Sequence, residues 1–378
     1  MKDYLFGIAI LAGTIIGVGM FSLPLVTHKA GVAAFLFFII IFGCLQYYIH
    51  LLFTEITLRT KENHRLPGYA EIYLGKKAKY FTTFIAVFSN YAALLAYIII
   101  GGIFLHDLLD PYLGGDIFTY SLILFLLQAV ALLFGLRMVA SLELILTFLL
   151  LIIVFLITFR GWPHIDINNF SALDLKYSIL PYGAVLFAVS GLSAIPIIRK
   201  LFSGAERKLK KVVAWGTFIP LVVMIIFTLV VVGITGGNTT SDTLTGLRHS
   251  LSDGIIIFSL IFGLLTITTS FLVVAEACRE IFCWDFKIKK FPAWVFAVWP
   301  PLILFILGWQ DLTKVVSISG GTLGSLSVLF IIWIGFIAKT KKTLKPYFSV
   351  SLPKWFLYIL SIVFIIGTIL SAISGLLL

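Results

Sequence analysis

Long apolar runs separated by short polar stretches dominate the sequence. Residues 31–58, 80–105 and 254–275 each exceed the about 20 residues that an α-helix needs to cross a bilayer. The apolar runs between charged residues or Gly/Pro breaks predict an all-α integral membrane protein. Its eleven transmembrane helices are expected at 4–27, 31–58, 80–106, 117–136, 139–159, 178–201, 210–234, 254–279, 292–309, 312–338 and 354–376.

The composition agrees with a polytopic membrane protein. Of the 378 residues, 60% are hydrophobic and 12% are charged, against about 45–50% and 25% in a soluble domain. The loops are too short to bury a core of their own. The three cysteines lack metal-binding spacing, and no Ser/His/Asp or phosphate-loop constellation occurs. We therefore expect no cofactor and no enzymatic activity, and chemistry within the membrane favours transport.

The net charge of +11 has two interpretations, nucleic-acid binding or membrane orientation. If the N-terminus is cytoplasmic, 23 of the 28 cations fall in inside loops and 5 in outside loops, which also carry eight Asp residues. The positive-inside rule accounts for this separation. We therefore expect no nucleic-acid partner and a multi-pass protein of a prokaryotic inner membrane, with its N-terminus cytoplasmic and its C-terminus outside.

Two predicted spans contain matching helix breakers. Gly19 and Pro24 in the first span have the spacing of Gly191 and Pro196 in the sixth. Because five spans separate them, the two segments cross the membrane in opposite directions. Such paired breaks indicate the site of an inverted-repeat transporter, whereas close helix packing through Gly13-x-x-x-Gly17 is the alternative. The match between the breaks and the topology favours a site.

An unwound segment can bind a zwitterion without a charged side chain. A half-helix starting near Val18 presents free N–H groups to a carboxylate, and one ending near Ile15 presents carbonyls to an ammonium group or Na⁺. The middle of neither span contains a charged residue. Backbone dipoles are therefore expected to recognise the substrate.

The stretch AGTIIGVGMFSLP at 12–24 resembles the first helix of the tryptophan/tyrosine (aromatic amino acid) permeases. These belong to the amino acid/auxin permease branch of the amino acid–polyamine–organocation superfamily. TTSFL at 268–272 and the Gly191–Pro196 break resemble the eighth and sixth helices of that family. The resemblance implies a five-plus-five inverted repeat, with repeats at 1–160 and 161–340, an extra helix within 341–378, and unwound helices 1 and 6.

The resemblance also implies roles for single residues. Backbone N–H groups of Val18, Gly19 and Met20 would bind the substrate carboxylate. The amine or side chain would be faced by Ile15, Phe187, Ala188 and Ser190, and helix 3 would bring Asn90 to the pocket. Polar contact between helices is an equal alternative for Asn90.

A sodium site is implied at the carbonyls of helix 1 and the hydroxyls of helix 8. The matching residues are Gly13, Ile16, Thr266, Thr269 and Ser270. Positions 266, 269 and 270 share one helix face by their spacing. The alternative is that these hydroxyls bond back to carbonyls of their own helix. Proton-coupled members of the branch resemble the same segment, so the coupling ion stays open between Na⁺ and H⁺.

Acidic residues inside predicted spans are candidates for proton transfer. Glu55 precedes Arg59 by four residues and Glu276 precedes Arg279 by three, which favours ion pairs at the cytoplasmic interface. Glu143 lacks such a partner and is the candidate proton relay. Around 66–75, the sequence predicts a short amphipathic cytoplasmic helix.

The sequence thus predicts a symporter of neutral, large or aromatic amino acids that works by alternating access and is driven by Na⁺ or H⁺. One alternative is an uncoupled exchanger or a carrier of another small solute. A cationic substrate would need acids near the breaks, and none lies within a turn of them. A non-transporting amino-acid sensor is a second alternative, disfavoured because the chain adds no soluble tail. Oligomeric state is left open.

Overall fold

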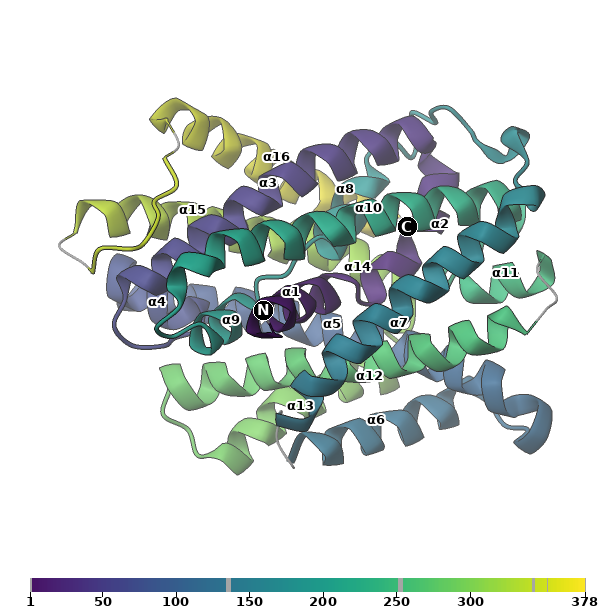
Figure 1. Cartoon of the computed structure of the whole chain (residues 1–378), viewed down its shortest axis with the longest axis horizontal. Helices are drawn as coiled ribbons and strands as arrows, with labels where there is room; N and C mark the ends of the chain where they lie inside the picture. The colour runs from purple at the N-terminus through teal and green to yellow at the C-terminus, as the bar shows by residue number, and fades with distance from the viewer. Residues whose placement is uncertain (1, 134–136, 251–253, 342–343, 352, 378) are drawn as a thin grey trace.

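The computed structural model describes residues 2–133, 137–250, 254–341, 344–351 and 353–377. All regular secondary structure in these ranges is helical, and most helices run along the long axis of the molecule (Figure 1). The predicted all-α class is therefore confirmed for the described part of the chain.

The first half of the chain contains the first broken span and four longer helices. Its helices are α1 (Lys2–Ile15), α2 (Val18–Ala30), α3 (Val32–Arg59), α4 (Leu66–Leu74), α5 (Lys76–Leu113), α6 (Ile117–Leu133) and α7 (Arg137–Gly161). The short helix α4 lies where the sequence predicts an amphipathic helix, since Pro67 is compatible with a first helical turn and Gly75 ends the helix.

The second half contains the second broken span and more interruptions. Its α-helices are α8 (Leu180–Ala188), α9 (Ile195–Leu201), α10 (Leu209–Thr235), α11 (Leu244–Ser250), α12 (Ile255–Glu280), α13 (Lys290–Ile306), α14 (Leu312–Ile318), α15 (Ser325–Thr340) and α16 (Lys354–Leu377). Two π-helical turns, Ile281–Asp285 and Ser319–Gly324, follow α12 and join α14 to α15. Short 3₁₀ turns lie at Trp162–His164, Ile167–Asn169, Glu206–Lys208 and Gly236–Asn238.

Six helical stretches within the described residues are long and apolar enough to cross a membrane, or seven with the bent pair α1 and α2. Each predicted span coincides with one or two helices, and the count of eleven spans stays a prediction. The helix α5 runs well beyond the predicted 80–106 at both ends, because its polar ends continue the helix outside the apolar run. The predicted span 312–338 is interrupted by the π-turn.

The two ends of the molecule differ in charge. Arg199, Lys200 and Lys290 lie at one end, and Asp107, Asp110 and Asp116 lie at the other. We call the end formed by α4, α9 and the start of α13 the basic end, and the end formed by α11 and the α5–α6 and α2–α3 junctions the acidic end (Figure 1). Hydrogen bonds between distant segments hold each end together. Lys341 bonds to the carbonyls of Ile72 and Tyr73 at the basic end, and Val32 N–H bonds to the Ser171 carbonyl at the acidic end.

The broken helices occupy the core of this bundle. The half-helix α1 packs against α7 and α10, and α2 packs against α8 and α10. Leu11, Ile16, Met20 and Leu23 are among the largest fully buried side chains. The interrupted segments are therefore surrounded by protein, which is where irregular backbone can exist at membrane depth.

Candidate functional site at two helix breaks

The first break separates α1 from α2 in the middle of the predicted first span. The two half-helices meet at an angle of 46° across Ile16 and Gly17. The N–H groups of Val18 and Gly19 lie in the first turn of α2, where an α-helix offers no acceptor of its own. Met20 N–H, in contrast, bonds to the Gly17 carbonyl at 3.2 Å. Two free N–H groups at the positive end of a helix dipole suit a carboxylate.

The second break is longer and is held by side chains from other helices. Residues 189–194 connect α8 to α9 without regular helix. The N–H of Gly191 donates to Nε2 of His50 on α3, at 3.0 Å. Nη1 of Arg65 donates to the carbonyl of Ser193 at 2.6 Å. This break therefore depends on two ionisable side chains that lie far away in sequence.

Glycine allows the half-helices to approach each other. A Cβ atom on Gly19 would lie 2.6 Å from Cα of Ala188, and one on Gly191 would lie 2.6 Å from Cδ1 of Leu11. Neither distance is compatible with undisturbed packing. The sequence left close helix packing and a binding site as alternatives for the two breaks, but the two are compatible because the packing is what brings the breaks together.

A cavity of about 130 Å³ lies against both breaks. A buried water needs only about 10–15 Å³ on this scale, so the cavity is larger than a single-water void. Seven of the eight predicted substrate residues line it. They are Ile15, Val18, Gly19, Asn90, Phe187, Ala188 and Ser190. The eighth, Met20, is fully buried and does not line the cavity.

The cavity wall is divided between small polar and apolar groups. The polar lining includes Thr14, Ser89, Tyr97, Ser319 and Ser327, whereas aromatic and aliphatic lining comes from residues such as Phe53, Leu186 and Ile331. Neutral donors and acceptors beside an apolar wall are typical of a site for a small molecule with one polar and one apolar part.

Among the described residues that line the cavity, Arg65 alone carries a fixed charge, and no local sequence pattern predicted its position there. Its Nε donates to Oε2 of Glu280 at 2.9 Å, and its Nη2 forms an ion pair with the same carboxylate. Its guanidinium lies 5.5 Å from the ring centroid of Trp284. Arg65 lies directly before α4 and Glu280 is the last residue of α12. Their ion pair therefore joins these two helices and closes the cavity at the basic end.

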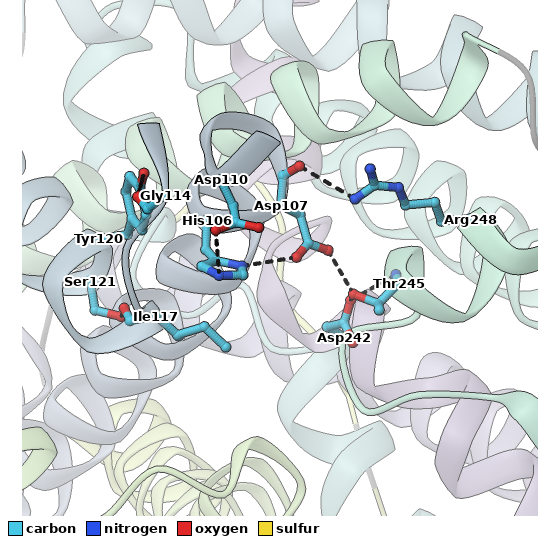
Figure 2. Close-up of polar contacts among 10 residues, drawn as sticks. All are labelled: His106, Asp107, Asp110, Gly114, Ile117, Tyr120, Ser121, Asp242, Thr245 and Arg248. Carbon is cyan, nitrogen blue, oxygen red and sulfur yellow. Dashed lines mark hydrogen bonds and ion pairs between the residues drawn. The ribbon is translucent and has the colours of Figure 1, made fainter. Parts of the chain in front are cut away.

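The acidic end is closed by a different set of contacts, shown in Figure 2. The Thr245 hydroxyl on α11 lies 2.9 Å from the carboxylate of Asp107 on α5 and 2.6 Å from that of Asp242, and its single proton can be donated to either. Arg248 donates to the backbone carbonyl of Asp107 at 3.4 Å, and His106 lies 3.2 Å from the Asp107 carboxylate. These contacts attach α11 to the end of α5.

An aromatic layer lies beneath α11. Phe21 on α2 packs edge-to-face against Phe104 and Phe227, with ring centroids 5.2 and 6.0 Å apart. Thr243 donates from its hydroxyl to the Phe21 carbonyl at 2.5 Å. The cavity lining includes Leu66 and Arg65 of the basic end but none of these three aromatic residues. In this conformation the cavity therefore extends toward the basic end.

The predicted sodium ligands lie on facing elements. Oγ of Ser270 donates to the Gly13 carbonyl at 3.4 Å, which connects α12 to α1 close to Ile16. Thr269 bonds within its own helix, to the Thr266 carbonyl at 3.0 Å. The buried Thr266 hydroxyl has no hydrogen-bond partner among the described residues. Oxygen donors of this kind fit a hard cation such as Na⁺, although back-bonding, the alternative, describes Thr269.

The other predicted polar residues have clear locations. Glu55 pairs with Arg59 and Glu276 with Arg279, so both predicted ion pairs are confirmed. The side chain of Glu143 lies outside the described residues. Sequence reasoning missed His50 entirely, because a single histidine in the apolar run 31–58 carries no pattern that identifies its partners.

The tryptophan/tyrosine permease family model matches residues 1–373. The tyrosine-specific transport system 1 of Haemophilus influenzae is 27% identical over 295 residues, which cover 74% of this chain and 72% of that relative. Glutamine transporter 2 of Aliivibrio fischeri is 25% identical over 293 residues, with 73% and 74% covered. These relatives are transport proteins and not enzymes.

A solved transporter structure has a similar arrangement of helices. The crystal structure of MhsT in complex with L-phenylalanine aligns with a TM-score of 0.72 at 15% identity, covering 98% of both chains. At this identity, the likeness shows the arrangement of the helices and carries no information about the ligand.

Proposed function

The chain belongs to the tryptophan/tyrosine permease family, and we propose that it is a secondary active transporter of neutral, large or aromatic amino acids that works by alternating access. The observation that carries the proposal is the cavity against both helix breaks, lined by seven of the residues that the family resemblance implied. The family match and the named tyrosine transport relative support an aromatic substrate.

The cavity suits a zwitterion for three physical reasons. Free N–H groups of Val18 and Gly19 attract a carboxylate. The carbonyl end of α1 near Ile15 attracts an ammonium group. Phe53 and Phe187 add apolar surface for a side chain. Because Arg65 is already paired with Glu280, a substrate with a net charge would meet no free counter-charge on this wall.

The proposal includes orientation and energy coupling. With the basic end in the cytoplasm of a prokaryotic cell, the positive-inside rule is satisfied. The cavity then extends toward the cytoplasm as far as the Arg65–Glu280 pair, and uptake requires one conformation that opens between α11 and α2 and another in which this pair separates. The driving ion is Na⁺, held at the residues around Gly13 and Ser270, or H⁺.

Uptake into proteoliposomes tests the function. We expect labelled tyrosine, tryptophan and phenylalanine to exchange against unlabelled amino acid, and to accumulate when an inward Na⁺ or H⁺ gradient is imposed separately. Glutamine and a cationic amino acid measure the breadth of selection. Exchange of none of these amino acids above empty liposomes would contradict the proposal, and exchange without accumulation would favour the uncoupled exchanger.

A double variant tests the sodium version. Thr269→Ala with Ser270→Ala removes two hydroxyls from the predicted ion site, so any stimulation of uptake by Na⁺ should disappear. Thr268→Ala is the matched control, because Thr268 bonds to the Leu264 carbonyl and lies 3.2 Å from the Gln128 amide. Persistent Na⁺ stimulation in the double variant would place the sodium site elsewhere.

A further inference from the structure

A buried histidine holds the second helix break. His50 on α3 is 0% exposed, and three polar groups surround its ring. Nδ1 lies 3.0 Å from the hydroxyl of Thr217 on α10. Nε2 accepts the N–H of Gly191 at 3.0 Å and lies 3.2 Å from the side-chain amide of Gln46, one turn earlier on α3.

These partners fix the protonation state of the ring. A backbone N–H can only donate, so Nε2 must present its lone pair to Gly191. In a neutral imidazole the proton then sits on Nδ1, from which it is donated to the Thr217 hydroxyl. The conformation described here therefore contains a neutral His50 with one defined tautomer.

We propose that His50 is the proton-coupling residue of the transporter, and that a proton bound at Nε2 releases Gly191 and with it the break between α8 and α9. This inference rests on the proposed transport function and assigns its driving ion as H⁺. The proton adds to the lone pair of Nε2. In returning to the neutral state, Nε2 gives the proton to water on the side to which the cavity has opened, and the bond to Gly191 forms again.

The three partners of the ring respond differently to that proton. The Thr217 hydroxyl accepts from Nδ1–H in both states. The amide of Gln46 has a donor and an acceptor end, so a rotation lets its oxygen accept from a protonated Nε2. Gly191 has only its N–H to offer and loses its acceptor. The proton therefore acts selectively on the backbone of the break.

The charged groups of the surrounding helices lie toward the ends of those helices. α3 itself carries Glu55, which is paired with Arg59 and Lys339. Arg199 on α9 bonds to Asn63 and to the Thr60 carbonyl. The remaining charged or titratable groups of α2, α8, α9, α10 and α15, the helices that pack against α3, are His28, Lys29, Tyr182, Lys200, Lys210 and Lys211, and α3 itself adds Cys44, Tyr47 and Tyr48.

No acidic side chain among the described residues contacts the ring of His50. An imidazolium in this environment would be a buried charge without a counter-ion, which is costly. Protonation is therefore favoured only when the structure rearranges to bring water or substrate nearer. Ser190 and Leu192, on either side of Gly191, line the cavity, so such a rearrangement acts directly on the substrate site.

The test separates proton coupling from transport itself. Exchange of labelled against unlabelled tyrosine in proteoliposomes needs no ion gradient, whereas accumulation under an inward pH gradient requires coupling. In His50→Gln we expect gradient-driven accumulation to fall by at least about tenfold, within the usual range of coupling between two sites. Exchange should continue and lose the dependence on pH that the unmodified protein shows.

Two further variants make the result specific. Gln46→Leu removes the group that accepts from protonated Nε2, so the pH dependence of accumulation should move toward lower pH. Gln128→Leu is the matched control, because the same change is made at an amide that bonds to Thr268 and not to His50, so it should not move the pH dependence. Gln46→Leu decides the question if His50→Gln does not yield folded protein.

The possible results are distinguishable. Absence of exchange in the unmodified protein with any amino acid would refute the proposed function and the inference together. Accumulation that requires Na⁺ and ignores the pH gradient would refute only the inference. So would full pH-driven accumulation in His50→Gln, or an unshifted pH dependence in Gln46→Leu.

Discussion

The two helix breaks differ in what satisfies their backbone groups. At the first break, the N–H groups of Ile16 and Gly17 bond to carbonyls of the preceding turn, at 2.7 and 2.8 Å. Hydrogen bonds that reach the neighbouring turns from elsewhere in the chain come from hydroxyl groups, among them Ser270 on α12 and Thr243 in the loop before α11. At the second break, an imidazole and a guanidinium contact the irregular segment itself.

This difference indicates that the two breaks respond differently to pH and to charge. Hydroxyl groups do not titrate in the physiological range, so the geometry of the first break is independent of pH and suits a constant substrate cradle. A histidine and a paired arginine respond to protons and to the separation of charge. Under the proposed transport function, we therefore expect the first break to bind the substrate and the second break to control the conformational cycle.

The largest expected effect comes from filling the first break. Gly19→Leu places a side chain against Ala188, where even a Cβ atom would lie 2.6 Å from Cα. It also pushes the carboxylate away from the N–H groups of Val18 and Gly19. Displacements of about 1 Å cost on the order of 100-fold in positioned chemistry, so we expect uptake and exchange of tyrosine to fall by about that factor.

Expression and helical content of Gly19→Leu should stay normal, as measured by size-exclusion chromatography and circular dichroism. Gly237→Leu is the matched control, because a Cβ atom there has no neighbour within 4 Å. Near-normal exchange in Gly19→Leu would show that the carboxylate does not bind at the first break, and the division between the breaks would be wrong.

The second prediction concerns Arg65, the guanidinium at the second break. Arg65→Ala leaves Glu280 without its partner and the Ser193 carbonyl without its donor, and breaking a buried ion pair costs about 3–5 kcal/mol. If only about 1.4 kcal/mol of this cost falls on the conformation with a closed basic end, the equilibrium between the closed and open conformations shifts tenfold. We expect the basic end to open more often and the rate of uptake to fall by about tenfold.

The opening can be measured directly. A cysteine at Ser89, which lines the cavity, should react faster with a water-soluble thiol reagent applied from the basic side of Arg65→Ala. Arg65→Lys should show an intermediate effect, because lysine keeps the charge and loses the forked contact. Lys341→Ala, at the same end, is the control. Unchanged reactivity in Arg65→Ala would refute the closing role.

The sequence predicted the elements whose signals are local. Glycines and prolines weaken a helix wherever they stand, so both breaks were identified, and i,i+3 or i,i+4 spacing was enough to pair Glu276 with Arg279 and Glu55 with Arg59. The cavity residues followed from the family resemblance, and seven of eight line one cavity. Met20 is fully buried and does not line it, and its N–H bonds to the Gly17 carbonyl.

The contacts that control the second break were not predictable in this way. His50 and Gly191 are 141 residues apart, and Arg65 and Ser193 are 128 apart. Each side chain acts on a backbone atom, which leaves no complementary residue type in the sequence. Two further elements were missed for a related reason. The residues of the π-turn at Ser319–Gly324 have the apolar pattern of a continuous span, and those of the short helix α11 have the polar pattern of a loop.

The smallest predicted effect tests the hydroxyl contacts of the first half-helix pair. Thr243→Val removes one neutral hydrogen bond to the Phe21 carbonyl, worth about 1 kcal/mol, so uptake of tyrosine should change by about fivefold at most. Its dependence on pH should not change, because no titrating group is involved. Thr239→Val, whose hydroxyl bonds to the Gly236 carbonyl within the same loop, is the control. A loss of uptake in Thr243→Val as large as that in Arg65→Ala, or a changed pH dependence, would contradict the comparison of the two breaks. A neutral contact of α2 would then govern the conformational cycle as strongly as the ionisable contacts, and conformational control would not reside at the second break.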